Sequence, residues 1–267
     1  MKDSASTDPV LCELISAFTG NVTSVEPIGR GGFTDLTAVV TADAGRFFVK
    51  AMRNRPGGRR DQMLRERAIN PCVRSLAPAL LWSGENGDWI VYGFERVEGR
   101  RTDFRPGSDD LPVITELVNR IGVLELPDVA RDWQETRWDW WADEGAPELF
   151  RGDALLHADV NPGNLLIGEG RAWVVDWSWP TRGAAFIDPA MLVHQLIAAG
   201  HTPDEAEALA ADCPAWTEAD PAAIDAFVIA YARMNRHRAL RNPGQPWLGA
   251  MAEATEAWAA FRGLRWS

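Results

Sequence analysis

The apolar pattern of this sequence changes from strand-like to helical near residues 95–100, and this change constrains the fold more than any other feature. Before it, short apolar runs alternate with glycine and aspartate turns, interrupted by one charged, helix-favouring stretch over 59–69. After it, helical spacing dominates, with one β-type insertion over 155–176. The sequence therefore predicts an α+β protein with a small β-rich N-terminal domain, residues 1–95, and a larger, mainly helical C-terminal domain, residues 96–267.

Local start and stop signals place the expected elements. Helices are expected where Thr, Asp or Pro can begin them and apolar residues recur at helical spacing, and Asp188 is expected to cap one of them. Strands are expected in short apolar runs, and Gly87-Asp88 is typical of a hairpin turn. The expected helices span 7–18, 59–69, 111–124, 203–211, 221–240 and 247–261, with another beginning at Asp188-Pro189. The expected strands span 25–28, 38–41, 46–49, 89–94, 164–167 and 172–175.

The charge of the chain excludes one class of partner. The net charge is −11, and residues 128–220 alone hold 18 acidic and 5 basic residues. Nucleic-acid binding needs a basic surface, so nucleic acid is not an expected partner. No run approaches the about 18 apolar residues of a membrane span. The N-terminal segment carries Asp3 and Asp8 and lacks the uninterrupted apolar core of a signal peptide. With three widely spaced cysteines, the chain is expected to be cytoplasmic, with no membrane partner.

The sharpest local signal is the pattern HxDxxxxN, formed by His157, Asp159 and Asn164 and followed twelve residues later by Asp176. Phosphoryl transfer needs a carboxylate near the acceptor hydroxyl and oxygen ligands that hold Mg²⁺ on the nucleotide phosphates. Asp159 suits the first role, as catalytic base. Asn164 and Asp176 suit the second as metal ligands, because the two expected strands between them form a hairpin. A hydrolase that binds a metal through His157 and Asp159 is the alternative.

Residues upstream of this motif suit nucleotide phosphates. Lys50 is the only lysine besides Lys2, and Glu66 lies on the next expected helix, where it can pair with Lys50. Their structural alternatives are a strand-end lysine and a solvated surface charge. A glycine-rich turn precedes Lys50, and its backbone N–H groups can approach phosphate unless it is a plain hairpin turn. The glycines concerned are Gly29, Gly31 and Gly32.

Together these motifs resemble the aminoglycoside phosphotransferase family of small-molecule kinases, over residues 22–240. The resemblance implies a protein-kinase-like two-lobe fold. It also implies that the phosphoryl donor is ATP, with GTP as the alternative, and that the donor is bound with Mg²⁺. It also implies that His157 braces the catalytic loop and that adenine bonds to the backbone of Glu95 and Val97. Two departures are a short GRGGF loop and Ala158 where the family often has glycine.

The short spacing after the metal motif favours a small-molecule kinase over a protein kinase. Eleven residues separate Asp176 from Asp188, too few for a long activation segment. A pseudokinase that binds nucleotide as a regulator is another alternative, but the residues whose loss would mark it are all present: Lys50, Asp159, Asn164 and Asp176.

Aromatic and acidic residues crowd the segment before the catalytic motif. Cations favour aromatic faces and carboxylates, so Trp138, Asp139 and Asp143 are predicted to line a pocket for a small cationic acceptor. An aminoglycoside or another basic antibiotic fits this description, with an amino sugar or a choline-like metabolite as the alternative. The structural alternative is a packed segment with one solvated acidic face.

Overall fold

The computed structural model describes residues 8–28 and 34–266. The chain divides into two compact units, the first comprising Met1–Gly99 and Val175–Ser178 and the second Arg100–Val174 and Trp179–Ser267. The break follows Gly99, whereas the sequence suggests a boundary after residue 95, and the short segment that carries Asp176 groups with the first unit. Within the described part of the chain, no helix has the length and apolar character needed to cross a membrane.

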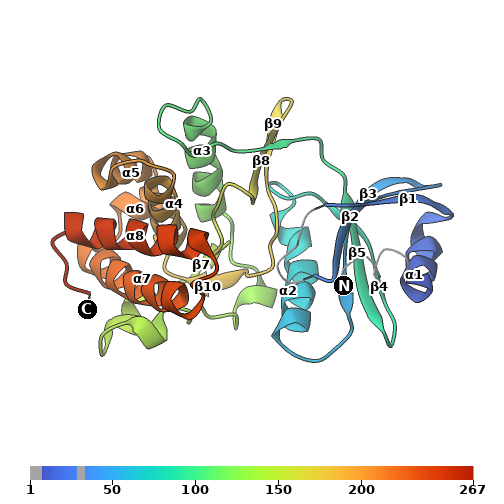
Figure 1. The fold of residues 1–267 in the computed structure, drawn as a ribbon, viewed down its shortest axis with the longest axis horizontal. Helices are drawn as coiled ribbons and strands as arrows, with labels where there is room; N and C mark the ends of the chain where they lie inside the picture. The colour runs from blue at the N-terminus through green and yellow to red at the C-terminus, as the bar shows by residue number, and fades with distance from the viewer. Residues whose placement is uncertain (1–7, 29–33, 267) are drawn as a thin grey trace. The chain divides into compact units, whose positions relative to one another are not determined.

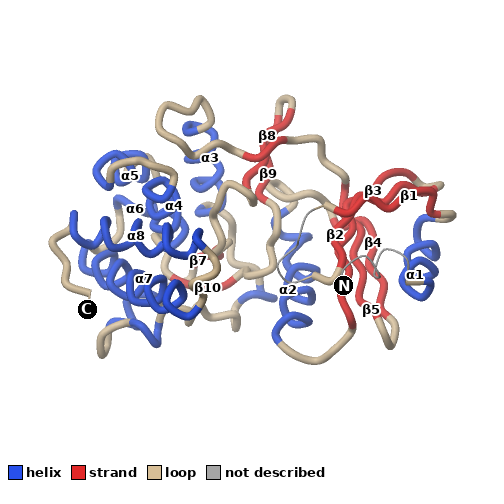
Figure 2. Tube along the Cα trace, viewed as in Figure 1, coloured by secondary structure: helices blue, strands red, loops and turns tan. Residues whose placement is uncertain are grey.

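A five-stranded antiparallel sheet in the order β1-β2-β3-β5-β4 forms the first unit, with two helices (Figures 1 and 2). The strands and helices confirm the expected order of elements, including the hairpin at residues 87–88. The strands are β1 Val22–Pro27, β2 Leu36–Ala42, β3 Gly45–Arg53, β4 Leu80–Glu85 and β5 Trp89–Glu95, and the helices are α1 Pro9–Thr19 and α2 Gly58–Val73.

The two helices pack on opposite faces of this sheet, as Figure 1 shows. Successive side chains of a strand point to opposite faces, and β5 follows this rule. Trp89 and Val91 pack in one apolar cluster with Leu11 of α1, whereas Tyr92 packs in another with Met63 of α2. Each helix therefore covers a separate half of the core.

Helix α1 begins within the range where the sequence predicts a helix, directly after a capping aspartate. Asp8 precedes the helix, and its carboxylate accepts hydrogen bonds from the backbone N–H groups of Val10 and Leu11, at 3.0 and 3.3 Å. Pro9 occupies the first turn, where its missing N–H costs no hydrogen bond. Arg53 of β3 also pairs with the Asp8 carboxylate at 2.7 Å, which ties the helix start to the sheet.

The second unit is mainly helical, as the sequence predicts, and carries short strands near the catalytic motif (Figure 2). Its strands form a three-stranded sheet, β6-β8-β9, and a pair, β7-β10. The helices are α3 Leu111–Gly122, α4 Ile187–Ala198, α5 Pro203–Ala210, α6 Pro214–Thr217, α7 Pro221–Arg241 and α8 Pro246–Phe261, with 3-10 turns at Asp128–Ala130, Asp139–Trp141 and Ala146–Phe150. The strands are β6 Arg100–Arg101, β7 Ala154–Leu156, β8 Leu165–Gly168, β9 Arg171–Val174 and β10 Thr181–Gly183.

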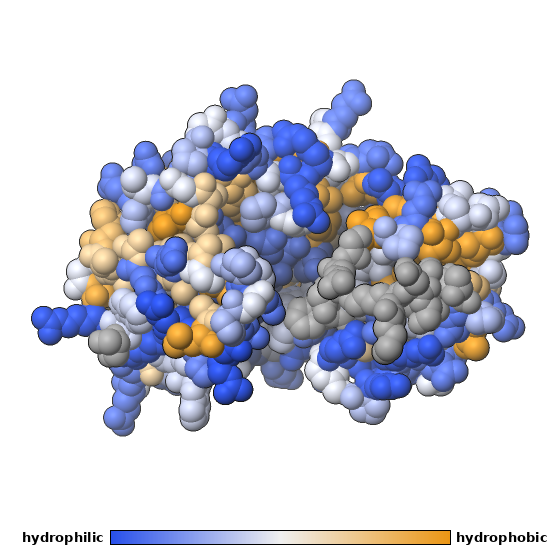
Figure 3. All heavy atoms as spheres, viewed as in Figure 1, coloured by the Kyte–Doolittle hydropathy of each residue, from blue (hydrophilic) through white to orange (hydrophobic). Residues whose placement is uncertain are grey.

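Helix α4 forms the centre of this unit. Its residues from Ile187 to His194 are all buried. The apolar pattern of α4 therefore runs around the helix rather than along one face. By contrast α8 is partly exposed at both ends, at Trp247 and Phe261, and Figure 3 shows apolar residues gathered over α8 on the face drawn.

Candidate active site

Lys50 lies between two carboxylates in the first unit. Its Nζ is 2.6 Å from Oε1 of Glu66 and 2.8 Å from Oδ1 of Asp176. The alternation of β3 directs Lys50 to the same face as Met52, which packs in the cluster that includes α2. Glu66 lies one helical turn after Met63 on the buried side of α2, so strand and helix periodicity together produce the predicted pair.

The two carboxylates keep the Lys50 ammonium charged. Burial alone lowers the pKa of Lys50, but the charges of Asp176 and Glu66 and their hydrogen bonds more than offset this, so the pKa is raised above its ordinary value. Burial also raises the pKa of Glu66. The charge of Lys50 and its hydrogen bond lower this pKa, and the charge of Asp176 raises it. A fixed positive charge in this position can bind a phosphate oxygen.

Asp176 combines an unusual backbone with an accessible carboxylate. Its φ is +61°, in the left-handed region that Asp tolerates better than most residues. Its side chain is 45 % exposed, although Lys50 and the hydroxyl of Ser178 both donate hydrogen bonds to Oδ1. An accessible carboxylate of this kind is suited to a hard cation such as Mg²⁺.

In the second unit, Asn164 holds the predicted base. Its Nδ2 donates to the backbone oxygen of Asp159 at 2.9 Å and to Oδ2 of the same residue at 2.8 Å. Asn161 also donates to the Asp159 backbone oxygen, at 3.0 Å, and accepts from the N–H of Gly163. Both hydrogen bonds of Asn164 come from its amide nitrogen, which leaves the amide oxygen the lone pairs that a cation needs. The motif residues 159 and 164 are thus brought together as one group.

Asp188 has a different role from the one that the sequence suggests. The prediction that it caps its helix is wrong, because α4 begins at Ile187 and Asp188 is its second residue. Its carboxylate instead accepts from the backbone N–H groups of His157 and Ala158, both at 2.8 Å. It is 2 % exposed, and burial raises its pKa against the effect of these partners. Asp188 therefore braces the start of the catalytic loop from a distant element.

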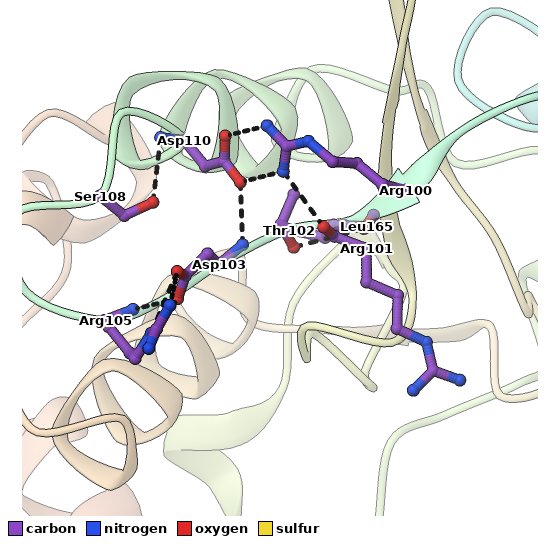
Figure 4. Close-up of polar contacts among 8 residues, drawn as sticks. All are labelled: Arg100, Arg101, Thr102, Asp103, Arg105, Ser108, Asp110 and Leu165. Carbon is purple, nitrogen blue, oxygen red and sulfur yellow. Dashed lines mark hydrogen bonds and ion pairs between the residues drawn. The ribbon is translucent and has the colours of Figure 1, made fainter.

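A second set of contacts fixes the end of the catalytic loop (Figure 4). Thr102 donates through its N–H and its hydroxyl to the carbonyl oxygen of Leu165, at 3.2 and 3.3 Å, directly after Asn164. The preceding strand β6 pairs with β8 and is tied to the start of α3, because Arg100 makes two hydrogen bonds to the Asp110 carboxylate at 2.5 and 2.6 Å. Nothing local in the sequence marks Thr102 or Asp110 for this role.

All the predicted nucleotide contacts remain predictions, although Lys50 and Glu66 do form the predicted pair. Gly29, Gly31 and Gly32 lie outside the described residues. At the end of β5, the N–H of Glu95 donates to Ala79 at 2.8 Å, so a base bound there would need its carbonyl oxygen. The carbonyl of Val97 accepts from Arg96, so a base would use the N–H of Val97.

The predicted acceptor residues are packed or paired. Trp138 is 1 % exposed and packs edge-on against Phe227 and Tyr231 of α7. This packing agrees with the alternative of a packed segment rather than with a pocket wall. Asp139 pairs with Arg151 through both oxygens at 3.1 and 2.5 Å. Asp143 pairs with Arg233 at 2.8 Å. The sequence lacks any signal that separates these partners from its other arginines.

Comparison with known proteins gives a consistent fold. The sequence matches no family model and no curated protein. Its structure resembles choline kinase LicA from Streptococcus pneumoniae, with a TM-score of 0.65 and 13 % identity over 95 % of this chain and 99 % of that one. The chain has a protein-kinase-like fold. A thermostable mutant of aminoglycoside phosphotransferase APH(4)-Ia matches with a TM-score of 0.61, at 14 % identity over 94 % of this chain and 98 % of that one.

A third protein of similar structure was solved in complex with a nucleotide analogue. Amicoumacin kinase hAmiN, in complex with AMP-PNP, Ca²⁺ and Ami, gives a TM-score of 0.62 at 12 % identity, over 97 % of this chain and 96 % of that one. Identities this low show a shared fold, which is the fold that the motifs predict.

Proposed function

We propose that this protein transfers the γ-phosphoryl group of ATP, bound with Mg²⁺, to a hydroxyl of a small acceptor. The observation that carries the proposal is the charged Lys50 between Glu66 and Asp176, at 2.6 and 2.8 Å. The two carboxylates keep the ammonium charged, and the side chain of one of them, Asp176, is 45 % exposed. In the second unit, the hydrogen bond from Asn164 to the proposed base Asp159, at 2.8 Å, also supports the proposal.

The residues present suit a nucleotide and its metal. Asp176 offers a carboxylate and Asn164 an amide oxygen, both hard ligands of the kind Mg²⁺ prefers. Lys50 supplies positive charge for phosphate oxygens. When bound, Mg²⁺ neutralises charge on the transferring phosphate.

Asp159 is the proposed base. It accepts the proton of the acceptor hydroxyl as the new oxygen–phosphorus bond forms and the bond between the β- and γ-phosphates breaks, releasing ADP. Asn164 and the backbone contacts of Asp188 keep the carboxylate in a fixed place, so that little reorganisation is needed during the reaction.

The acceptor is proposed to be small and cationic. The acidic excess of residues 128–220 supports this charge, although Asp139 and Asp143 already have arginine partners. The solved proteins of this fold include an aminoglycoside phosphotransferase, a choline kinase and an amicoumacin kinase. An aminoglycoside or other basic antibiotic is the first acceptor to test, and an amino sugar or a choline-like metabolite the second.

The test is ADP release with a panel of these acceptors, followed by Asp159→Ala. We expect kcat to fall at least about 100-fold, because the proton acceptor is lost. Calorimetry is expected to show nucleotide binding within about threefold of the original, since Lys50 and Asp176 remain. Asp153→Ala is the matched control, because the side chain of this aspartate in the same segment is 87 % exposed, and the variant is expected to keep its activity. Near-normal turnover by Asp159→Ala would contradict the mechanism.

A further inference from the structure

Arg137 contacts the peptide group that precedes the proposed base. Its Nη1 donates to the carbonyl oxygen of Ala158 at 2.7 Å. That carbonyl belongs to the planar peptide that joins Ala158 to Asp159. Its orientation therefore fixes the direction in which the backbone continues to Asp159. Ala158 has a φ of +58°, a conformation that a non-glycine residue adopts only when its surroundings hold it there.

The backbone and guanidinium of Arg137 are themselves fixed by a buried carboxylate. Glu135 is 3 % exposed, and its Oε1 accepts from the N–H of Arg137 at 2.7 Å. Its Oε2 accepts from the hydroxyl of Thr181 at 2.9 Å and lies 3.5 Å from Nη2 of Arg137. A carboxylate held at both oxygens by other groups is a rigid anchor for the arginine.

Two aromatic rings complete the setting. The guanidinium carbon of Arg137 lies 4.9 Å from the ring centroid of Trp138 and 5.4 Å from that of Trp179. Both distances are within the range of a cation–π interaction, which favours this position of the guanidinium. The burial of Trp138, which removes it from the predicted pocket, thus gives it a role beside the catalytic loop.

Asp188 and Arg137 hold different groups of the same short segment. Asp188 accepts from the N–H groups of residues 157 and 158, and Arg137 donates to the carbonyl of residue 158. We infer that Arg137 is a positioning residue, which fixes the Ala158 carbonyl and thereby aims Asp159 at the acceptor hydroxyl. This inference rests on the proposed function.

The test compares Arg137→Ala with Arg182→Ala. Arg182 is a matched control because it also donates to loop carbonyls, those of Gly152 and Arg131 at 3.2 and 2.9 Å, but not to the catalytic loop. We expect R137A to lower kcat about 10- to 100-fold, because small misplacements of a reacting group cost this much, while KM for ATP stays within about twofold. R182A is expected to change kcat less than about threefold.

Two further measurements separate positioning from folding. Hydrogen exchange is expected to quicken in a peptide covering residues 154–166 of R137A, and not of R182A, whether or not an acceptor is known. Arg137→Lys keeps the charge and one donor, so it should recover part of kcat and also covers the case in which R137A does not fold.

The outcomes are distinguishable. Unchanged exchange in R137A, or a kcat equal to that of R182A, overturns the role of Arg137 while the proposed function stands. An R137K variant no better than R137A also counts against it if both are folded. A wild-type chain that transfers no phosphate to any acceptor contradicts the proposed function itself, and the catalytic role of Arg137 with it.

Discussion

Lys50 is 8 % exposed, and the charge of its ammonium group is compensated by Glu66 and Asp176 rather than by water. A buried charge of this kind is tolerated only while its partners remain. Glu66 is 4 % exposed and Asp176 is much more accessible, so the two carboxylates depend on Lys50 to different degrees. At the scale of the residue, a change at Lys50 therefore affects activity and stability through separate partners.

Lys50→Met is expected to abolish phosphotransfer and to lower the free energy of unfolding by about 3 kcal/mol, because it leaves the Glu66 carboxylate buried without its cation. The double variant K50M/E66M is expected to regain most of this stability, since no buried charge remains at either position. It should regain no activity. Urea unfolding and ADP release measure the two effects, and a double variant as unstable as K50M would disprove this account of Glu66.

Helices α4 and α8 are joined by a buried histidine. His194 of α4 lies 3.0 Å, through Nε2, from the backbone oxygen of Met251 in α8, so Nε2 carries the proton and donates it. Among the described residues its Nδ1 has no hydrogen-bond partner, and the ring packs edge-on against Tyr231. Burial lowers the pKa of His194 from 6.5 to about 4, and the positive charge of Arg238 adds to this effect.

This packing predicts an acid-sensitive contact at the scale of the element. The unfolded chain binds a proton at this histidine more readily than the folded chain, so the stability that neutral His194 provides is complete above pH 6.5 and is lost as the pH falls towards 4. The loss is at most about 3 kcal/mol. His194→Gln keeps a donor for Met251 and removes the titration, so the difference between the two unfolding curves from pH 7 to 4 measures it. A constant difference over that range would refute the prediction.

At the scale of the whole molecule, the acidic excess is partly neutralised at short range. Carboxylates of the segment before the catalytic motif pair with arginines from several elements: Asp128 with Arg131, Glu135 with Arg137, Asp139 with Arg151, Asp143 with Arg233, and Asp153 with Arg182. A net charge of −11 still remains over the chain and acts at longer range. A cationic acceptor would then be attracted by this field rather than by single carboxylates.

Asp139→Asn and Asp143→Asn are therefore expected to leave KM for a cationic acceptor within about twofold, because each carboxylate already has an arginine partner. Raising the salt from about 0.05 to 0.5 M is expected to raise that KM several-fold, since salt screens long-range attraction. A neutral acceptor serves as the control and should show no such rise. If either asparagine variant raises KM about tenfold or more, the charge acts locally, as the sequence first suggested.

Local patterns in the sequence predicted the elements and much of the candidate site. The cap of α1 at Asp8, the alternation of β3 and β5, and the pairing of Lys50 with Glu66 depend on neighbours close in sequence or one element apart. The strands β6 and β10 are not predicted, because two or three residues are too few to show a period, whereas β7 overlaps the start of the expected β-type insertion over 155–176. The kinase-like fold was predicted through the family resemblance, which depends on the motif residues and their spacing.

Only the tertiary structure decided which distant groups meet. Asp188 is 30 residues or more from the amides that it binds, and Arg137 is 21 residues from the Ala158 carbonyl. From the sequence alone, any of the 25 arginines could pair with Asp139. Only the folded structure shows that its partner is Arg151. Helix and strand periods arise from interactions between near neighbours, and so the sequence determined them, whereas ion pairs and loop braces depend on how the elements pack.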